Sequence, residues 1–355
     1  MRVLHVTNRL SEGGVETFLF NLLPALRNVG IEADLLVLDK SEIMMAERFR
    51  DHGVNVFISP YDRVRNLKNI KFIMDICSQY DIVHSHLFPS QYFVAIAGFL
   101  KKKKLVTTEH CNFNKRRKKF FKPIEYIVYA LYDAVVGVSV AATNNLNKWL
   151  PILRDKNICI VNGIELEHFD QVTAINRKEI NVSENSFLIV MTARFFKQKD
   201  HLTLVEALPH LPTNVEVIFI GSGETMDASL SEAKKLNISH RCHFLGRRQD
   251  VAEIIKTSDL CVLSTFYEGL PISVIEYMAS GKAVVATKVD GLSEMIDDSC
   301  LAEPGDPKDL ANKINKMICD SSFKKLMETR NIAKSEDFSI EKMVSSYISL
   351  YKSLS

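Results

Sequence analysis

Short apolar runs, rich in Val, Ile and Leu, alternate with segments of helical periodicity along most of the chain. Such runs are typical of strands buried on both faces of a parallel sheet, and the helices between them supply the right-handed crossovers that parallel strands need. The runs form two series, at residues 2–7, 33–38, 54–59, 81–86, 104–109, 134–139 and 157–162, and at residues 187–192, 215–221, 242–246, 260–264 and 283–287. The pattern predicts an α/β protein with two doubly wound, Rossmann-like domains.

The two series are separated by residues 161–169, VNGIELEHF, and by a polar stretch that extends to Asn185. With 355 residues, the chain is also too long for one typical domain. We therefore expect one domain at 1–163 and a second at 164–338, facing each other across a cleft at their strand ends.

Residues 267–287, YEGLPISVIEYMASGKAVVAT, predict a loop, a short helix and a buried strand. Pro271 suits the first position of the helix, where its missing N–H costs nothing, and Gly281 can end the helix in a left-handed conformation. The loop follows the apolar run 259–265, so it lies at the sheet edge where open α/β sheets bind ligands. Free backbone N–H groups at 269–272 would make an anion site there.

Two carboxylates, Glu268 and Glu276, flank this predicted anion site. Each is expected to accept hydrogen bonds from hydroxyls of the group attached to the anion, because a negatively charged carboxylate has no favourable interaction with the anion itself. The pair suggests a sugar on one side of a phosphate and a ribose on the other, with Gly269, Leu270 and Pro271 forming the turn. The alternative is a loop charge at Glu268 and a solvated helix charge at Glu276.

Two cations follow the first strand of the second series. Arg194 and Lys199, in TARFFKQKD (192–200), lie in the loop at the carboxyl end of that strand, at the same edge. Two cations there would neutralise the charge that develops on a departing diphosphate. A solvated charge pair in front of a helix is the alternative.

The first strand of the chain is followed by SEGGVETFLFNLL, in which Gly13 and Gly14 open a helix. Two glycines allow a phosphate to approach the helix N-terminus closely, and a plain tight turn explains them equally well. The dinucleotide fingerprint GxGxxG is absent. His84, His86 and His110 fall near strand ends without the spacing or the carboxylate neighbours of a metal site, so we expect no metal there.

Seven motifs occur in the order found in one large family. They are GGVE (13–16), TEH (108–110), VNGIE (161–165), ARFFKQKD (193–200), GSGE (221–224), FLGRRQDV (244–251) and EGLPISVIEYMASGKAVVAT (268–287). Nearly the whole chain thereby resembles the retaining glycosyltransferases of the family 4 group (glycosyl transferases group 1), which have the GT-B fold. The last motif is the most specific, because both glutamates, the turn between them and the following strand all match. The family commonly has aspartate at the position of Glu165, so this residue is a conservative difference from the family pattern.

The resemblance implies a role for each candidate side chain. Glu268 would contact the donor sugar, Glu276 the nucleotide ribose, and Arg194 and Lys199 the diphosphate. His110 would lie beside the reacting sugar as a further catalytic residue.

The resemblance also assigns roles to backbone segments. Gly13 and Gly14 would approach the phosphates, and backbone around 221–224 and 245–251, including Gly221 and Gly223, would contact the base. The last segment, 339–355, has apolar residues on one helical stripe, and in the resembled fold this final helix packs back on the first, acceptor-side domain.

The chemistry that the resemblance implies is transfer of a hexose-type sugar from a nucleotide-diphosphate sugar to a glycan or lipid-linked acceptor, with retention of configuration. The leaving phosphate would take the acceptor proton, so the protein would only have to stabilise the departing diphosphate and the cationic sugar. No metal or other cofactor is expected, because Arg194 and Lys199 stand where a metal would and no Asp-x-Asp occurs in a cleft loop. We expect a UDP-linked donor, on frequency alone.

Three other functions share parts of this pattern. A nucleotide-sugar epimerase of the same fold would need acid and base groups on both sides of one sugar carbon, and a dehydrogenase would need the absent GxGxxG. A non-catalytic, nucleotide-sugar-binding partner subunit would not have to keep Arg194, Lys199, Glu268 and Glu276 together. Release of free nucleotide from a nucleotide-sugar would distinguish the enzyme from such a subunit.

Residues 101–122, KKKKLVTTEHCNFNKRRKKFFK, carry ten Lys or Arg against one acid, a net charge of +9 in a chain whose total is +2. Three phenylalanines interrupt the cations. No nucleic-acid readout motif accompanies them, so no nucleic-acid partner is expected, and a solvated loop is the other alternative. We expect a surface for anionic lipid, where each basic residue contributes about 1 kcal/mol, and an acceptor used in capsule, O-antigen or exopolysaccharide assembly.

The first residues, MRVLHVTN, have the pattern of a strand and not of a signal peptide, and no uncharged apolar stretch is as long as a membrane span. We therefore expect a cytoplasmic protein that is peripheral on the inner face of the membrane.

Overall fold

The computed structural model describes residues 1–11, 13–41, 43–110 and 117–355. The chain divides into two compact units, one of residues 1–164 together with 339–355 and one of residues 165–338. This division lies one residue from the boundary that the linker predicts, and the last segment belongs to the first unit.

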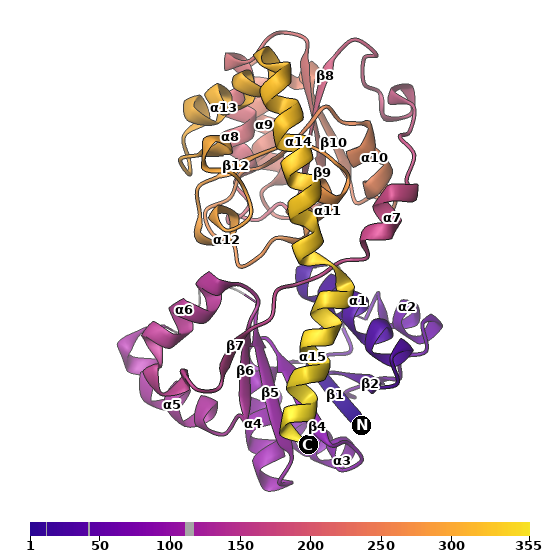
Figure 1. The fold of residues 1–355 in the computed structure, drawn as a ribbon, viewed down its shortest axis with the longest axis vertical. Coiled ribbons are helices and arrows are strands. Elements are labelled where there is room, and N and C mark those ends of the chain that lie inside the picture. The colour runs from indigo at the N-terminus through magenta and orange to yellow at the C-terminus, as the bar shows by residue number, and fades with distance from the viewer. Residues whose placement is uncertain (12, 42, 111–116) are drawn as a thin grey trace. The chain divides into compact units, whose positions relative to one another are not determined.

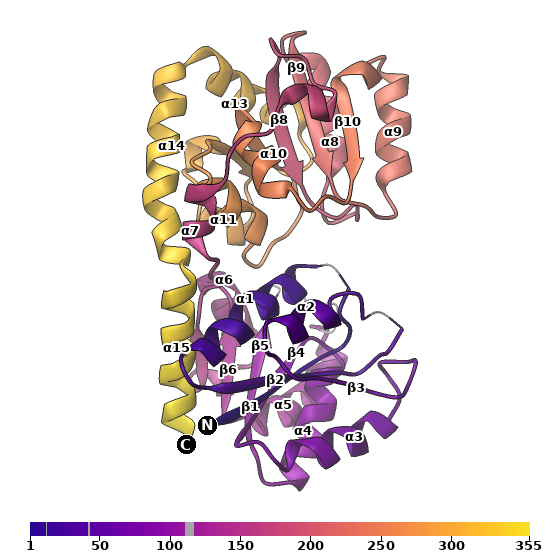
Figure 2. The ribbon, with the colours of Figure 1, turned by 90° about the vertical axis from the view of Figure 1, so that its right-hand side faces the viewer.

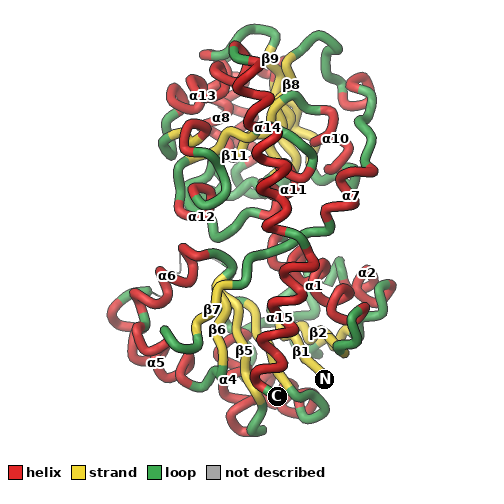
Figure 3. The backbone as a smooth tube through the Cα atoms, viewed as in Figure 1, coloured by secondary structure: helices red, strands yellow, loops and turns green. Residues whose placement is uncertain are grey.

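The first unit is built on a parallel sheet with the strand order β3-β2-β1-β4-β5-β6-β7, drawn in yellow in Figure 3. Its strands are β1 Arg2–Thr7, β2 Glu32–Val37, β3 Val56–Ile58, β4 Ile82–His86, β5 Lys104–Glu109, β6 Ala134–Gly137 and β7 Asn157–Cys159. Every apolar run of the first series overlaps one of these strands, and β3 and β7 are the shortest, with three residues each. The strand order reverses between β1 and β4, which is where doubly wound sheets place their ligands.

Helices cover both faces of this sheet (Figures 1 and 2). They are α1 Gly14–Asn28, α2 Ala46–Asp51, α3 Lys68–Cys77, α4 Ser90–Leu100, α5 Lys122–Ala130, α6 Val140–Trp149 and α15 Ile340–Leu354. On one face α4 contacts both α3 and α5, and a hydrophobic core cluster there includes Leu4, Val6 and Phe93. Because side chains alternate along a strand, His5 of β1 points to the opposite face, where α1 packs against α15.

Helix α15 runs beside α1, as Figure 2 shows. It begins after Ser339, whose hydroxyl accepts a hydrogen bond from the N–H of Lys342. Of the apolar stripe, Met343, Val344, Tyr347 and Tyr351 are buried, together with Leu350, while Ile340 and Ile348 are half-buried. The amphipathic pattern of this segment is therefore explained by packing within the first unit.

The second unit is built on a parallel sheet with the order β10-β9-β8-β11-β12-β13. Its strands are β8 Phe187–Thr192, β9 Val215–Ile220, β10 Cys242–Gly246, β11 Leu260–Leu263, β12 Val284–Thr287 and β13 Leu301–Ala302. The sequence does not predict β13, because a strand of two residues leaves no recognisable run. The order reverses between β8 and β11, so this sheet has its own switch point.

The helices of the second unit are α7 Leu166–Gln171, α8 His201–Ala207, α9 Met226–Lys235, α10 Val251–Thr257, α11 Ile272–Ala279, α12 Asp290–Ser293, α13 Pro307–Cys319 and α14 Ser321–Ser335. The prediction that Pro271 opens α11 was wrong by one position. Its backbone is extended, with ψ of 116°, so it is the N-cap and Ile272 is the first helical residue. Gly281 follows α11 in the left-handed conformation with φ of +73°, as predicted.

None of the described helices combines the length and the hydropathy needed to span a membrane.

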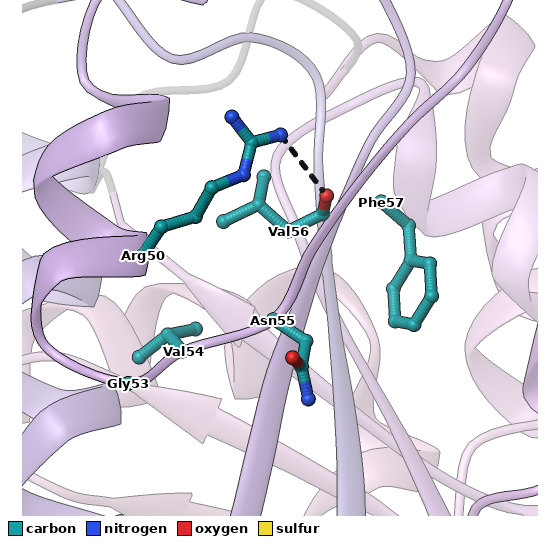
Figure 4. Close-up of a pocket in the computed structure, with 6 residues that line it drawn as sticks. All are labelled: Arg50, Gly53, Val54, Asn55, Val56 and Phe57. Carbon is teal, nitrogen blue, oxygen red and sulfur yellow. Dashed lines mark hydrogen bonds between the residues drawn. The ribbon is translucent and has the colours of Figure 1, made fainter.

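A hollow of about 330 Å³ lies at the amino end of β3 (Figure 4). It is lined by Arg50, Gly53, Val54, Asn55, Val56 and Phe57. The guanidinium of Arg50 donates a hydrogen bond of 3.4 Å to the carbonyl of Val56, which is the dashed line in Figure 4. Ligands of open α/β sheets bind at the carboxyl ends of the strands, and this hollow lies at the other end. It is therefore separate from the candidate site.

Candidate functional site

The loops after β8 and β11 meet at the switch point of the second sheet. The ammonium group of Lys199 forms an ion pair with Oε1 of Glu268, and this oxygen also accepts a 3.0 Å hydrogen bond from the hydroxyl of Thr265. The Glu268 side chain is 7% exposed and the Lys199 side chain 20%. Both residues are expected at this edge from the sequence, but their direct contact is not.

Further hydrogen bonds join the same two loops. The carbonyl of Gln198 accepts hydrogen bonds from the backbone N–H of Phe266, at 2.9 Å, and from the hydroxyl of Thr265, at 2.9 Å. The side-chain amide of Gln198 donates to the carbonyl of Tyr267 at 2.7 Å. Gln198 therefore positions the loop that carries Glu268, and nothing in its sequence context indicates this role.

The turn after Glu268 has free hydrogen-bonding groups. Oε2 of Glu268 has no donor within the described parts of the chain, and the backbone N–H groups of Gly269, Leu270 and Ile272 have no acceptor there. A Cβ at Gly291 would lie 2.2 Å from the carbonyl oxygen of Gly269, so only a glycine lets the start of α12 pack on this turn. The predicted anion-binding turn is thus built with its N–H groups available.

Arg194 lies in the same loop as Lys199 but in a different environment. Its side chain is exposed and its guanidinium lies 5.1 Å from the centre of the Phe196 ring. It forms no ion pair with any residue that the structure describes. The positive charge is therefore available to an anionic ligand.

Gly221 and Gly223 hold the loop after β9 against the loop that carries Arg194. Their φ angles are +137° and +152°, and a Cβ would lie 2.1 Å from the carbonyl oxygen of Ala193 or 2.4 Å from that of Phe195. The N–H of Phe195 donates to the carbonyl of Ser222 at 3.0 Å. This close backbone packing requires glycine at both positions, whereas their predicted contact with the base remains a prediction.

Glu276 lies on α11, one and a half turns after the cap. Its side chain is half-buried, and its carboxylate has no hydrogen-bond partner among the residues described. Burial raises the pKa of this carboxyl to about 7. Glu276 is thus less exposed than a solvated helix charge, and its contact with a ribose remains a prediction.

The corresponding edge of the first unit carries Gly13 and Gly14 after β1. Gly13 is extended, with φ of −169°, and a Cβ at Gly14 would meet nothing within 4 Å. The conformation of Gly13 is therefore one that any residue adopts, and Gly14 has room for a side chain. Close approach of a phosphate remains the predicted reason for them.

His110 follows β5 and is half-buried. Its Nε2 lies 3.0 Å from Nδ1 of His86, and the Phe18 ring packs edge-on against it with a centroid distance of 4.9 Å. Burial lowers the pKa of His110 to about 3, so the imidazole is neutral at physiological pH.

His5 lies beside the histidines that the sequence analysis singled out. His84 is central in β4, not at its end, and the ring nitrogens of His5, His84 and His86 lie within 4.8 Å of one another. Sequence reasoning missed His5, although β1 and β4 pair in a register that sets His5 beside His84. Such a triad could hold a metal ion, yet each of its ring nitrogens already makes a hydrogen bond.

The basic segment 101–122 is only partly described, because residues 111–116 lie outside the described residues. Lys103 donates hydrogen bonds to the carbonyls of Ser78 and Tyr80, and Lys104 forms an ion pair with Asp133 at 3.3 Å. These two cations therefore interact with other groups of the protein. Lys101, Lys102, Lys118 and Lys119 are exposed.

Apolar side chains are exposed beside these cations. On α4 they are Ile96, Phe99 and Leu100, and on α5 and the turn before it they are Phe120, Phe121, Ile124 and Ile127. The two helices contact each other, and on each helix the exposed residues recur at helical spacing. The α4 residues were not part of the predicted surface, because their exposure depends on which face of the helix the sheet covers.

Comparison with known proteins gives the same assignment from both halves of the chain. Residues 12–168 match the model of Glycosyltransferase Family 4, and residues 172–336 match that of Glycosyl transferases group 1. An Escherichia coli relative, UDP-Gal:alpha-D-GlcNAc-diphosphoundecaprenol alpha-1,3-galactosyltransferase, is 25% identical over 99% of this chain and 96% of its own.

Two further proteins extend the comparison. The N,N'-diacetylbacillosaminyl-diphospho-undecaprenol alpha-1,3-N-acetylgalactosaminyltransferase of Campylobacter jejuni is 28% identical over 48% of each chain. The crystal structure of Anabaena Alr3699/HepE in complex with UDP-glucose has the same fold, with a TM-score of 0.88 and 20% identity over 99% of this chain and 100% of that one.

The two matched families together span most of the chain, and the two parallel sheets have the architecture that these families share. The chain belongs to the GT-B glycosyltransferases of the family 4 group.

Proposed function

We propose that this protein moves a hexose-type sugar from a nucleotide-diphosphate sugar to a glycan or lipid-linked acceptor, with retention of configuration, in cell-surface polysaccharide biosynthesis. The observation that carries the proposal is the ion pair between Lys199 and Glu268 at the β8–β11 switch point, next to a turn with free N–H groups. A cation, a carboxylate and backbone donors in one place suit a ligand that combines phosphate with sugar hydroxyls.

The donor contacts follow from which groups are free. Oε2 of Glu268 can accept from sugar hydroxyls, and the carboxylate of Glu276 can accept from ribose hydroxyls. Arg194, Lys199 and the N–H groups of the turn can bind the diphosphate. A UDP-linked donor is supported by the E. coli relative, whose name specifies UDP-Gal, and by the UDP-glucose complex of HepE.

In the proposed reaction the bond from the sugar C1 to the diphosphate oxygen breaks, and a bond from C1 to the acceptor oxygen forms on the same face. The acceptor proton passes to the leaving phosphate, so charge and atoms balance without a protein base. Arg194 and Lys199 stabilise the negative charge that develops on the diphosphate, in the role that a metal ion has in other transferases. The pairing of Lys199 with Glu268 holds the ammonium group in place before the donor binds.

The proposed acceptor is carried by a lipid. The names of the E. coli and C. jejuni relatives both specify acceptors linked to diphospho-undecaprenol. The exposed apolar stripes of α4 and α5, together with the exposed cations beside them, form what we term the α4–α5 surface. Apolar side chains that dip into the interface and cations that face anionic headgroups would hold the enzyme on the inner face of the membrane.

The first test is a thermal-shift panel of nucleotides and nucleotide-sugars. A ligand at a hundred times its dissociation constant stabilises a protein by about 2.7 kcal/mol. We expect one nucleotide-sugar to stabilise the wild type and the exposed-loop control Lys197→Ala, and to be hydrolysed slowly to free nucleotide. If no nucleotide or nucleotide-sugar shifts the melting temperature, the proposed function is wrong.

The stereochemistry is tested on the product. With the donor identified, NMR of the glycosylated acceptor should show the same anomeric configuration as the donor sugar. An inverted linkage would contradict retention and would require a base that the proposed mechanism omits.

The membrane role is tested by sedimentation with vesicles that contain anionic lipid. We expect binding that falls with added salt and that is weakened in Ile124→Ser/Ile127→Ser and in Lys118→Gln/Lys119→Gln. Exposed lysines of the second unit, changed in Lys234→Gln/Lys308→Gln, provide the matched control. Equal losses in the control and test variants would mean that net charge, and not the α4–α5 surface, drives binding.

A further inference from the structure

Seven buried or half-buried side chains of the first unit form one continuous hydrogen-bonded chain. In order they are Tyr347, Thr108, His84, Tyr351, His5, His86 and His110. Each link joins neighbours, at 3.3 Å, 2.7 Å, 2.7 Å, 3.4 Å, 3.0 Å and 3.0 Å in that order. The chain connects α15 to the sheet edge at His110. Of its members only His110 has a role implied by the family resemblance, and the reaction proposed above uses none of them.

The histidines of this chain are neutral, because burial lowers the pKa of His5 and His110 to about 3 and that of His84 and His86 also falls well below its usual value. A neutral imidazole has one N–H and one bare nitrogen, so an imidazole that accepts on one side must donate on the other. A hydroxyl has one hydrogen to donate and can accept more than one hydrogen bond. If Thr108 or Tyr351 accepted from both of its neighbours in the chain, its own hydrogen would have no acceptor among the described residues. Both of these hydroxyl hydrogens are used only if all the links point in the same direction, either toward His110 or toward Tyr347.

The end at Tyr347 decides between the two directions. Tyr347 is fully buried, and its only hydrogen bond among the described residues is the one to Thr108. If the chain pointed toward Tyr347, the tyrosine would accept from Thr108 and its own O–H would be buried without an acceptor. A buried donor without a partner costs about 1–3 kcal/mol. If the chain points toward His110, Tyr347 donates to Thr108 and every hydrogen in the chain is used.

We propose that this chain holds His110 in one neutral tautomer, with the proton on Nδ1 and the bare Nε2 accepting from Nδ1–H of His86. Tyr351 of the last helix is then a positioning residue for a group at the sheet edge, and His5 and His86 transmit its effect. The Nδ1–H of His110 has no acceptor within the described residues, so it remains to donate to a ligand.

The inference rests on the proposed function where it assigns a use to this donor. A neutral His110 with Nδ1 protonated can donate a hydrogen bond to a sugar hydroxyl, and its bare nitrogen is already occupied by His86. It is therefore not free to act as a general base. This agrees with a mechanism in which the leaving phosphate takes the acceptor proton.

A metal ion at His5, His84 and His86 is the rival arrangement for the same atoms. Ligation would require a bare nitrogen from each ring and would replace the hydrogen bonds between His5 and His86, and those of His84. The chain instead satisfies every one of these nitrogens without an ion. The two arrangements make different predictions for metal content and for tautomer.

The test is nitrogen NMR of the intact protein labelled with ¹⁵N-histidine, which distinguishes protonated from bare ring nitrogens. In the wild type we expect His5, His84, His86 and His110 each to be neutral and to carry the proton on Nδ1. Assignment uses single His→Asn variants. A wild-type His110 that carries its proton on Nε2 would overturn the proposed direction. A measured content of one zinc ion per protein molecule would show that these histidines bind a metal ion instead of forming the hydrogen-bonded chain.

The variant Tyr351→Phe removes the hydroxyl that links His84 to His5 and leaves the ring that packs in the core. Nε2 of His5 then lacks a hydrogen-bond partner whether it is bare or protonated, so neither direction of the links from His5 to His110 is favoured and we expect signals from both tautomers of His110. With about half of the molecules in the competent tautomer, the apparent donor affinity should fall about twofold. Tyr80→Phe, which removes a buried hydroxyl bonded to Asp34 outside the chain, is the matched control and should leave His110 unchanged.

The outcomes separate the two proposals. An unchanged His110 tautomer in Tyr351→Phe would overturn the role of Tyr351, whatever the enzyme activity. If the protein shows the expected histidine tautomers but binds no nucleotide-sugar, the hydrogen-bonded chain is supported and the proposed function is wrong.

Discussion

Between β8 and β11, the second unit places an ion pair, an exposed arginine and free backbone N–H groups at the edge of its sheet. Between β1 and β4, the first unit places two glycines and neutral imidazoles that are hydrogen-bonded to one another. Both sheets are parallel and both reverse their strand order at these points. The doubly wound topology thus supplies only the position of a site, and the side chains that follow the strands decide whether it suits an anion or a neutral hydroxyl group.

The largest expected effect is that of Lys199→Ala. Loss of one group that stabilises a developing negative charge costs about 2.7–4 kcal/mol, or about 10²–10³ in turnover. We also expect a lower melting temperature, because Glu268 would remain buried without its cation. Steady-state turnover and thermal unfolding, measured beside Lys197→Ala, check both effects.

The double variant Lys199→Met/Glu268→Gln separates the two roles of Lys199. It removes both charges of the pair, so stability should recover relative to Lys199→Ala while turnover should not. Recovery of turnover would mean that neither charge of the pair contributes to the reaction.

Arg194→Ala should reduce turnover by about 10², at the lower end of the same range. Its side chain is exposed and its guanidinium lies over the Phe196 ring, with no ion pair to any of the described residues, so stability should change by no more than about 0.5 kcal/mol. Arg194→Lys keeps the charge and should retain more activity than Arg194→Ala. Near-normal turnover in Arg194→Ala would mean that Arg194 is a solvated loop charge without a role in the reaction.

Glu276→Gln should weaken binding of the free nucleotide about tenfold, since a hydrogen bond to a charged group is worth about 1.5–3 kcal/mol and the amide keeps part of it. Titration calorimetry with the nucleotide measures this. Equal affinities of wild type and variant would mean that Glu276 does not contact the ribose.

The raised pKa of Glu276 gives this prediction a pH dependence. The folded-state pKa of about 7 lies above the ordinary 4.5, so the folded protein binds the extra proton and loses stability as pH rises from about 4.5 to 7. That loss should be absent in Glu276→Gln. The affinity of the wild type for nucleotide should instead rise through pH 7, as the carboxylate that accepts from the ribose forms.

The smallest effect is expected for Gly14→Ala in the first unit. A Cβ there meets nothing within 4 Å, and alanine is the better helix former, so stability should be unchanged or higher by up to about 1 kcal/mol. If a phosphate approaches this backbone, the apparent donor KM should nevertheless rise. Gly221→Ala provides the contrast, because its Cβ would clash with Ala193 and should destabilise the fold.

The sequence by itself determined the two doubly wound domains, because continuous apolar runs and helical periodicity are local properties of the chain. It also determined that the segments after two strands of the second unit carry Arg194, Lys199, Glu268 and Glu276, since the carboxyl ends of parallel strands share one edge. It did not predict β13, whose two residues leave no pattern, nor the helical boundary at Pro271, where the cap and the first turn have similar preferences.

Only the tertiary structure decided which side chains touch. The pairing of Lys199 with Glu268 joins loops that are 69 residues apart in sequence, and the bond between His84 and Tyr351 joins residues 267 apart. Such contacts depend on strand order and on which face each strand presents to α15. His5 is part of the histidine chain for that reason, because the register of β1 with β4 places it beside His84. Local sequence specifies which groups lie at the edge of a sheet, and packing between distant segments specifies which of them form hydrogen bonds or ion pairs with one another.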